Sequence, residues 1–230
     1  MNAVQSLSTI DWLALLTFLA CWGGYTWFSE HSRWCCEGLI GHLHGFRLAW
    51  AYRMLERELR MTDASLIGNL MGSVSFYANT TIYIIAGLVA AMGAADQLLS
   101  FSADLALGGT GSRELLEIKL MLVLASFVYG YFKFTWALRQ FNLLSILIGA
   151  APLGSRDDPE VERFGQRVAG IHNLAGDDFN RGIRAYYFGL AASGWLLSPI
   201  LLGVLSLSIL VVLYRRDYRS ATLAKLRPEL

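Results

Sequence analysis

The sequence predicts an all-α fold, a polytopic membrane helical bundle of four or five transmembrane helices. Of its 230 residues, 55% are hydrophobic and 16% are charged, whereas soluble domains carry about 25% charged residues. Mean hydropathy is +0.44. The apolar residues gather in runs long enough to cross a hydrocarbon core of about 30 Å, which takes roughly 20 helical residues. We therefore expect a single integral membrane domain, 1–230, without strands.

The first apolar run, Ile10 to Phe28, predicts the first span. No Lys or Arg precedes it and no cleavage site is clear, so we interpret it as a retained helix and not a secretory signal. Cys21 lies inside this run, and the neighbouring pair Cys35 and Cys36 are poor disulfide partners. No disulfide framework is implied.

Residues 29–63 predict a cytoplasmic amphipathic connection, rich in arginine. Within it, residues 47–63 have the pattern of an amphipathic helix, with Glu56 and Arg60 four residues apart in the favourable order for an ion pair. Such a helix can lie in the membrane interface and attract anionic lipid. A solvated face with local ion pairs explains the same charges equally well.

A second helix is expected from about Ala64 to Gly93. It carries a polar stripe at three- and four-residue spacing, made of Ser65, Asn69, Ser73, Phe76 and Thr80. Small polar residues commonly line contacts between membrane helices. The stripe therefore indicates either helix packing or the lining of a hydrophilic pathway.

Residues 94–118 predict an external loop. We interpret its glycine-rich part, residues 108–111, as a linker. Ser112 is placed to cap a third helix that starts near Arg113. This helix contains FVYGYFKFTWALRQFN, in which Lys133 and Arg139 interrupt an apolar segment that begins at Leu120. Helix rise puts Lys133 about 20 Å, and Arg139 about 29 Å, along that segment.

The remaining chain predicts a polar cytoplasmic loop at 153–183, a last apolar region at Tyr186–Tyr214 and a basic tail at 215–230. Proline interrupts helices, so Ser198-Pro199 could break the apolar region into a hairpin. The hairpin would put 17 cations inside and 2 outside, whereas one kinked helix gives 12 and 7. The excess of cations on the cytoplasmic side favours the hairpin and an external N-terminus.

Three stretches carry a resemblance to a known family: RELRMTDASLIGNLMGSVSFYANTT at 57–81, KLMLVLASFVYGYFKFTWALRQFNLLSILIGAAP at 119–152, and FNRGIRAYYFGLAASGW at 179–195 with VLYRRDYRS at 212–220. They resemble the bacterial and plant membrane proteins grouped as domain of unknown function 599. The resemblance implies a small all-helical membrane domain. It implies no activity.

The candidate ligand-binding residues are the polar groups near the predicted membrane segments: Lys133, Arg139, Asn142, Arg181, Arg184, Arg57, Asp63 and Asn69. Lys133 and Gln140 share a helix face, with Arg139 and Asn142 on a neighbouring one. A charge within a membrane is costly and usually faces protein or a cavity. Lys133 thus marks an anion, headgroup or proton site, unless it reaches the headgroups by snorkelling. Arg139 is expected to be an interfacial anchor.

Arg181 and Arg184 are spaced to bind a phosphate together, because guanidinium offers a bidentate fork. Anchoring of the positive inner face explains them as well. Convergence of these cations with Arg57 and Arg139 would require counter-charges, for which the available carboxylates are Asp63, Glu58, Asp177 and Asp178.

Metal and enzyme chemistry have little support in the sequence. The weak metal candidates are His31, Cys35, Cys36, His42 and His44, whose spacing matches no established zinc pattern. We expect no metal and no cofactor. No nucleophile–base pair, phosphate-cradling loop or dinucleotide fingerprint occurs, so an enzyme is the least supported class. A net charge of +1 gives no indication of nucleic-acid binding.

The first functional hypothesis is a non-enzymatic protein of the bacterial inner (plasma) membrane that binds anionic lipid, a small anion or a partner subunit at an arginine-rich cytoplasmic face. The partner could be a second copy of the chain. The alternative is a small-solute or ion transporter or channel that uses Lys133 and the polar stripe of the second helix.

Overall fold

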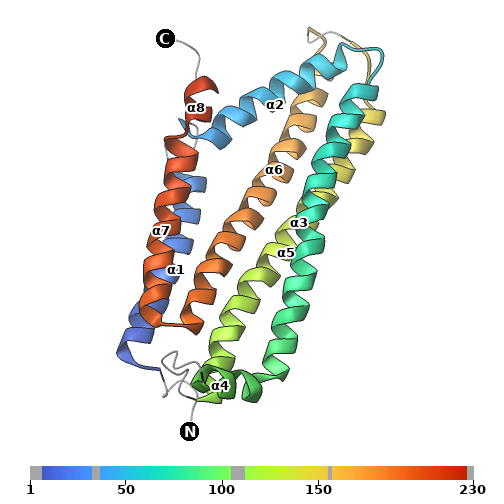
Figure 1. Cartoon of the computed structure of the whole chain (residues 1–230). Coiled ribbons are helices and arrows are strands. Elements are labelled where there is room, and N and C mark those ends of the chain that lie inside the picture. Colours follow the sequence, from blue (N-terminus) through green and yellow to red (C-terminus); the bar gives the residue numbers. More distant parts are fainter. Residues whose placement is uncertain (1–6, 33–36, 105–111, 155–156, 227–230) are drawn as a thin grey trace. The chain divides into compact units, whose positions relative to one another are not determined.

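The computed structural model describes residues 7–32, 37–104, 112–154 and 157–226. Within these ranges the regular structure is helical throughout, which confirms the all-α class. The elements in chain order are α1 Thr9–His31, α2 Leu39–Leu55, α3 Met61–Gly93, α4 Ala95–Asp104, α5 Arg113–Gly149, α6 Pro159–Ser193, the 3₁₀ turn η3 Gly194–Leu196, α7 Pro199–Tyr218 and α8 Ala221–Leu226 (Figure 1).

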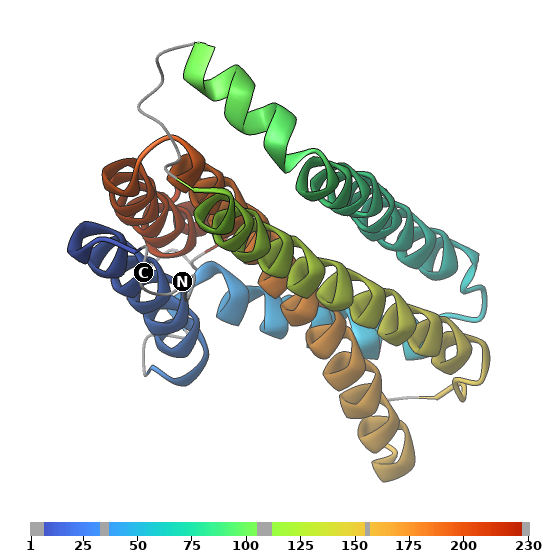
Figure 2. The same ribbon diagram turned by 90° about the horizontal axis from the view of Figure 1, so that it is seen from below.

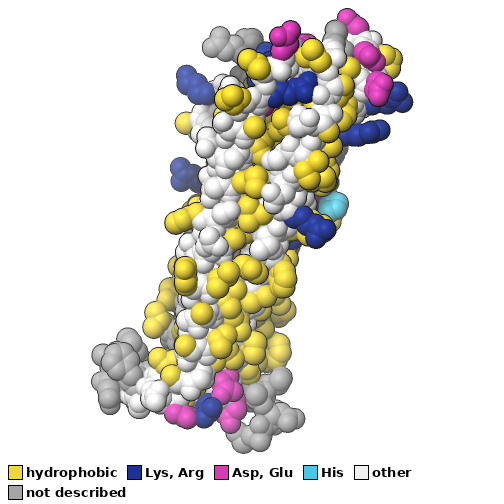
Figure 3. All heavy atoms as spheres, turned by 90° about the vertical axis from the view of Figure 1, so that its right-hand side faces the viewer, with side chains coloured by type: hydrophobic (Ala, Val, Ile, Leu, Met, Phe, Trp, Pro, Cys, Tyr) yellow, Lys and Arg dark blue, Asp and Glu magenta, His cyan; other side chains and the backbone are white. Residues whose placement is uncertain are grey.

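Three segments are long and apolar enough to cross a membrane: Met61–Gly93, Arg113–Gly149 and Pro199–Leu226. Large hydrophobic side chains lie on the surface, among them Phe132 and Ile146 of α5. Figure 3 shows hydrophobic side chains over much of one face of the molecule. Exposed apolar surface of this kind suits contact with lipid.

The first predicted span lies within α1. Its N-terminus is fixed by a capping box, in which the Ser8 hydroxyl accepts from the Asp11 backbone N–H and the Asp11 carboxylate accepts from the Ser8 N–H. α1 is not among the three segments above, because its Trp, Tyr and Gly residues lower its mean hydropathy.

The predicted helix at 47–63 is wrong in its second half, since α2 ends at Leu55 and α3 begins at Met61. The Arg60 guanidinium binds the backbone carbonyls of Met54, Ala151 and Pro152, and not the Glu56 carboxylate. The last carbonyls of a helix lack partners within it, so Arg60 satisfies one of them at the end of α2. These three hydrogen bonds replace the Glu56–Arg60 ion pair that was expected along a single helix.

α5 and α6 pack through aromatic side chains on one helix and glycines on the other. Phe127 and Phe134 are buried and seven residues apart, and so are the glycines that they cover, Gly189 and Gly182. A side-chain carbon at Gly182 would overlap the Phe134 ring, and one at Gly189 would lie 3.0 Å from the Phe127 ring. Small residues let membrane helices approach closely. The order of the contacts makes the two helices antiparallel.

The segment 153–183, expected as a loop between spans, is mostly helical and continues without interruption into the apolar end of α6. The interruption predicted at Ser198-Pro199 is present. η3 follows α6, and α7 begins at Pro199, where the Ser198 hydroxyl accepts from the Ile200 N–H. The end of α6 from Ile183 onward lies beside α7 (Figures 1 and 2), and Gly194 of η3 packs against Leu201 and Leu205.

The chain forms two compact units. The first unit comprises Met1–Ser32, Thr80–Gly130 and Ile183–Arg216, and the second comprises Arg33–Asn79, Tyr131–Gly182 and Asp217–Leu230. The helices α3, α5, α6 and α7 contribute residues to both.

The core of the first unit is apolar and aromatic. Phe18 and Phe188 pack edge to face, with ring centroids 5.9 Å apart. Two buried polar contacts tie α1 to α6 and η3: the Trp195 indole donates to Asp11 over 2.8 Å, and Arg184 donates to Ser29 and, over 2.8 Å, to Glu30. Between these contacts, α1 carries no charged residue.

Candidate functional site: cations held by a buried carboxylate

In the second unit, α5 and α6 bring four polar side chains together. The Lys133 ammonium donates to Asp178 Oδ1 over 2.9 Å, and the Arg181 guanidinium donates to the same oxygen over 3.0 Å. The Gln140 amide donates to Asp178 Oδ2 over 2.9 Å. Lys133 and Gln140 thus use their predicted shared face to bind one carboxylate. We refer to Lys133, Gln140, Asp178 and Arg181 as the Asp178 cluster.

Burial in the Asp178 cluster is uneven. The Asp178 side chain is 5% exposed, whereas Lys133 is 25% exposed and Arg181 is 29% exposed. The carboxylate therefore lies behind the two cations, which keep part of their surface accessible. Two positive charges share one negative charge, so the cluster has an excess of one cation.

The preceding residue on α6, Asp177, faces α2 and not α5. Its carboxylate lies 2.9 Å from the His44 Nε2. Arg47 donates to Asn173 over 3.3 Å and lies so close to Gly176 that a side chain there would overlap its guanidinium. Burial lowers the pKa of Arg47, and the charge of Asp177 partly offsets this effect. α6 therefore presents consecutive carboxylates to two different helices.

A third polar group surrounds Asp63, in the first turn of α3. Asp63 is fully buried, and its Oδ1 accepts from the Trp50 indole over 2.8 Å and from Arg57 over 2.7 Å. The same Trp50 packs edge-on against the ring of His172, with centroids 5.3 Å apart. Among the described protein groups, neither Asp63 Oδ2 nor His172 Nδ1 has a hydrogen-bond partner. Buried polar atoms of this kind usually bind water or a ligand.

His172 is uncharged near neutral pH. Burial lowers its pKa to about 4, and the positive charge of Arg47 acts in the same direction. The ring also packs against Phe141, at 5.9 Å between centroids. His172 contributes packing and a buried nitrogen, and adds no positive charge to the site.

The predicted arginines have separate partners. Arg57 pairs with Asp63, Arg181 with Asp178, and Arg184 with Glu30. Arg139 is exposed and its guanidinium lies 5.7 Å from the Trp136 ring. Asn142 is exposed as well. A carboxylate thus accompanies each of the three paired arginines, although Arg181 shares Asp178 with Lys133.

The polar stripe of α3 lies on an exposed face. Ser65, Asn69, Ser73 and Phe76 are all exposed, and only Thr80 is half-buried. Within the described part of one chain, most of the stripe is therefore open to the surroundings and not buried in the bundle. A second molecule could use this exposed face for packing.

Two of the five metal candidates, Cys35 and Cys36, lie outside the described residues. The others have different partners: His31 stacks on Trp27, His42 Nδ1 lies 3.1 Å from the Gly38 carbonyl oxygen, and His44 binds Asp177. Across the described ranges, no group of three His, Cys, Asp or Glu side chains could hold a metal ion.

From the sequence, Asp178 was only one of four possible counter-charges and Gln140 only a neighbour of Lys133 on its helix face, while Trp50, Arg47 and His172 were missed. A signal for Asp178 was available, because Asp178 and Arg181 have the i, i+3 spacing of a helical ion pair. The contacts of Trp50 and His172 depend on how α2 crosses α6, which helical spacing does not reveal.

The helices and the buried charges define an all-α protein with segments that could span a membrane. Residues 13–222 match the family described as "Protein of unknown function, DUF599", so the chain belongs to this family and the resemblance seen in the sequence is confirmed. No curated protein and no solved structure matches the chain.

Proposed function

We propose that the chain crosses the membrane five times, through α1, α3, α5, the apolar end of α6, and α7. For α1 the support comes from its two polar contacts. Asp11 and Ser29 are 18 residues apart, or about 27 Å of helix, which is close to the thickness of a hydrocarbon core. The Asp11–Trp195 and Arg184–Glu30 contacts would then lie near the two membrane surfaces.

The cations support an external N-terminus in a bacterial inner membrane. With five crossings, 17 Lys and Arg residues lie on the cytoplasmic side and 2 on the other. Arg215 and Arg216 stand in the last turn of α7, where cations also interact favourably with the helix dipole.

The function that the geometry supports best is non-enzymatic binding of an anion, either the phosphate of an anionic lipid or a small free anion. One observation carries this proposal: a buried carboxylate, Asp178, holds two partly exposed cations side by side. Asp178 fixes both cations before a ligand arrives, so little side-chain entropy is lost on binding. Phosphate oxygens accept charge-assisted hydrogen bonds from such groups.

Native mass spectrometry in mild detergent tests this proposal. The purified protein is mixed with equal amounts of phosphatidylglycerol and phosphatidylcholine with identical acyl chains. We expect the wild type to retain the anionic lipid preferentially, and Lys133→Met to reduce that retention about tenfold. This variant leaves Asp178 bonded to Gln140 and Arg181. Competition by inorganic phosphate would identify a free anion as the ligand.

Arg139→Gln is the matched control, since Arg139 lies on the same helix, is exposed and has no bond to Asp178. It should retain anionic lipid as the wild type does. Equal retention by Lys133→Met and the wild type, or an equal loss in Arg139→Gln, would contradict the proposal.

A transporter is the second candidate, favoured by the position of Lys133 within a candidate span and its contact with a carboxylate on the neighbouring helix. Ion pairs at membrane depth often mark transport or proton pathways. Four of the five residues of the α3 stripe are exposed in the described part of the chain. Anion or proton flux into liposomes that is abolished by Lys133→Met would favour transport, and absence of flux would exclude it.

A partner subunit, or a second copy of the chain, would pack against the exposed stripe of α3. Asn69 and Ser73 there offer polar groups for interhelical hydrogen bonds. The same mass spectra test this, because Asn69→Leu should reduce any oligomeric species. A wild type that is monomeric throughout would contradict it.

A further inference from the structure

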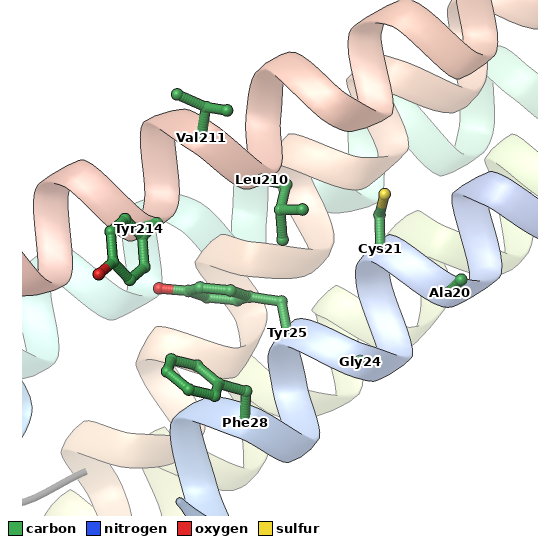
Figure 4. Close-up of a pocket in the computed structure, with 8 residues that line it drawn as sticks. All are labelled: Ala20, Cys21, Gly24, Tyr25, Phe28, Leu210, Val211 and Tyr214. Carbon is green, nitrogen blue, oxygen red and sulfur yellow. The ribbon is translucent and has the colours of Figure 1, made fainter. Parts of the chain in front are cut away.

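The first unit has an apolar groove between α1 and α7 (Figure 4). Its volume is about 540 Å³, within the range of ligand-binding pockets. Cys21, Gly24 and Phe28 line it from α1, and Val211 and Tyr214 line it from α7. No charged side chain contributes to the lining, so an occupant must be apolar where it contacts these walls.

The two hydroxyl-bearing side chains of the lining lie toward one end of the groove, whose walls are otherwise apolar. Tyr25 and Tyr214 contribute hydroxyl groups there, and in Figure 4 the Tyr25 hydroxyl points toward Tyr214. Arg215 follows Val211 by four residues, which places it on the same side of α7 one turn further along, and it is exposed. Its charge lies beyond the apolar walls and not among them.

This order matches the order of groups in a phospholipid, from an apolar chain through ester and glycerol oxygens to a phosphate. We propose that the α1–α7 groove holds one acyl chain of an anionic phospholipid, with its phosphate against Arg215. The hydroxyls of Tyr25 and Tyr214 lie at the level of the ester oxygens. The lipid belongs to the leaflet on the side of the Arg184–Glu30 contact. This site lies in the first unit and uses no residue of the Asp178 cluster.

Gly24 provides a selective test, because a side-chain carbon built there meets nothing within 4 Å. Gly24→Leu therefore places a side chain in the groove whose first carbon meets no protein atom, and leucine also favours helix over glycine. Gly23→Leu is the matched control. It is the same substitution one residue away, also into open space, and Gly23 lines a different groove with Trp22 and Thr26.

The experiment is native mass spectrometry of the full chain with phosphatidylglycerol, and with phosphatidylcholine of the same chain length. We expect Gly24→Leu to lower the affinity of the groove for both lipids at least about tenfold, seen as the loss of one bound lipid, and Gly23→Leu to leave the number of bound lipids unchanged. Arg215→Gln should lower the affinity for phosphatidylglycerol about tenfold and barely affect phosphatidylcholine, since it removes a charge-assisted hydrogen bond.

Wild-type affinity in Gly24→Leu, or an equal loss in both glycine variants, would overturn the groove site. So would a second copy of the chain that is bound by the wild type and lost in Gly24→Leu. Lys133→Met separates this inference from the proposed function. Lipid lost in Lys133→Met but kept in Gly24→Leu refutes the groove and leaves the Asp178 cluster as the site. The reverse result refutes the cluster and supports the groove.

Discussion

In both units, a phenylalanine ring of α5 packs over a glycine of α6, but the side chains around this contact differ. In the first unit Phe127 covers Gly189, next to aromatic side chains such as Tyr186, whose ring lies 5.1 Å away. In the second unit Phe134 covers Gly182, one residue after Arg181 and four after Asp178. One part of the helix pair thus packs among apolar groups, and the other beside a network of charges.

The two parts of the α5–α6 pair should differ in the amino-acid substitutions that they tolerate. Apolar contacts are non-directional, so related hydrophobic side chains substitute for one another at modest cost. A buried charge that loses its partner keeps the full cost of desolvation. Single substitutions in the Asp178 cluster should therefore cost more than substitutions among the apolar groups around Phe127, unless the latter create a steric overlap.

The largest effect is expected for Asp178→Asn, which leaves Lys133 and Arg181 without their shared counter-charge. Breaking a buried ion pair costs about 3–5 kcal/mol, and the partial exposure of both cations favours the lower limit. Thermal unfolding in detergent measures the loss. Asp96→Asn is the control, since its pair with Arg113 is more than half exposed on both sides and its loss should lower the melting temperature only slightly. Equal losses would show that burial of the carboxylate does not matter.

The next effect is a dependence of stability on pH through His172. Its folded pKa of about 4 lies below an ordinary value of about 6.5. Between these values the unfolded chain binds a proton that the folded chain does not, so the free energy of unfolding falls as pH drops through this window. The contribution is on the order of 3 kcal/mol. Denaturation at a series of pH values should give a shallower slope for His172→Phe than for the wild type, and identical slopes would contradict the burial of an uncharged imidazole.

A smaller effect, about 1–3 kcal/mol, is expected for Gly182→Ala, because the added methyl overlaps the Phe134 ring, which is fully buried. Gly189→Ala should cost less, since the Phe127 ring at 3.0 Å needs to move only slightly. Gly170→Ala on the same helix meets nothing and should stabilise by about 0.5–1 kcal/mol. The order of the three melting temperatures checks the packing, and a destabilised Gly170→Ala would contradict it.

The smallest effect is expected for Ser8→Ala in the first unit, which removes the N-cap of α1 and should cost about 1 kcal/mol. Thr17→Ala removes an exposed hydroxyl that donates to the Leu13 carbonyl oxygen within the helix and should change little. A cap variant as stable as the Thr17 variant would show that α1 is held by its packing alone.

Helix starts and interruptions were predictable, because they depend on nearby residues. Ser112 caps α5 by accepting from the Leu115 N–H, and the break before Pro199 follows from a missing N–H. The end of α2 was not predictable. An i, i+4 pair such as Glu56–Arg60 contributes only about 0.2–0.5 kcal/mol, and three distant or terminal carbonyls compete for the same guanidinium.

The anomaly of Lys133 was visible in the sequence, but its partner was not. Lys133 and Asp178 are 45 residues apart, on helices whose contact depends on how Phe134 fits over Gly182. The same Lys133 side chain could reach the membrane surface or contact another helix. Which of the two occurs depends on the tertiary structure. In the structure, the ammonium lies against the carboxylate.

The central claim is that Asp178 holds two cations in place for an anion. The most direct measurement is a density map of the wild-type protein in a nanodisc that contains phosphatidylglycerol. We expect Lys133 and Arg181 both to contact Asp178, with phosphate density within hydrogen-bonding distance of the two cations. A map in which Lys133 points away from Asp178 into the acyl chains, or in which the two cations contact no anion other than Asp178, would contradict it.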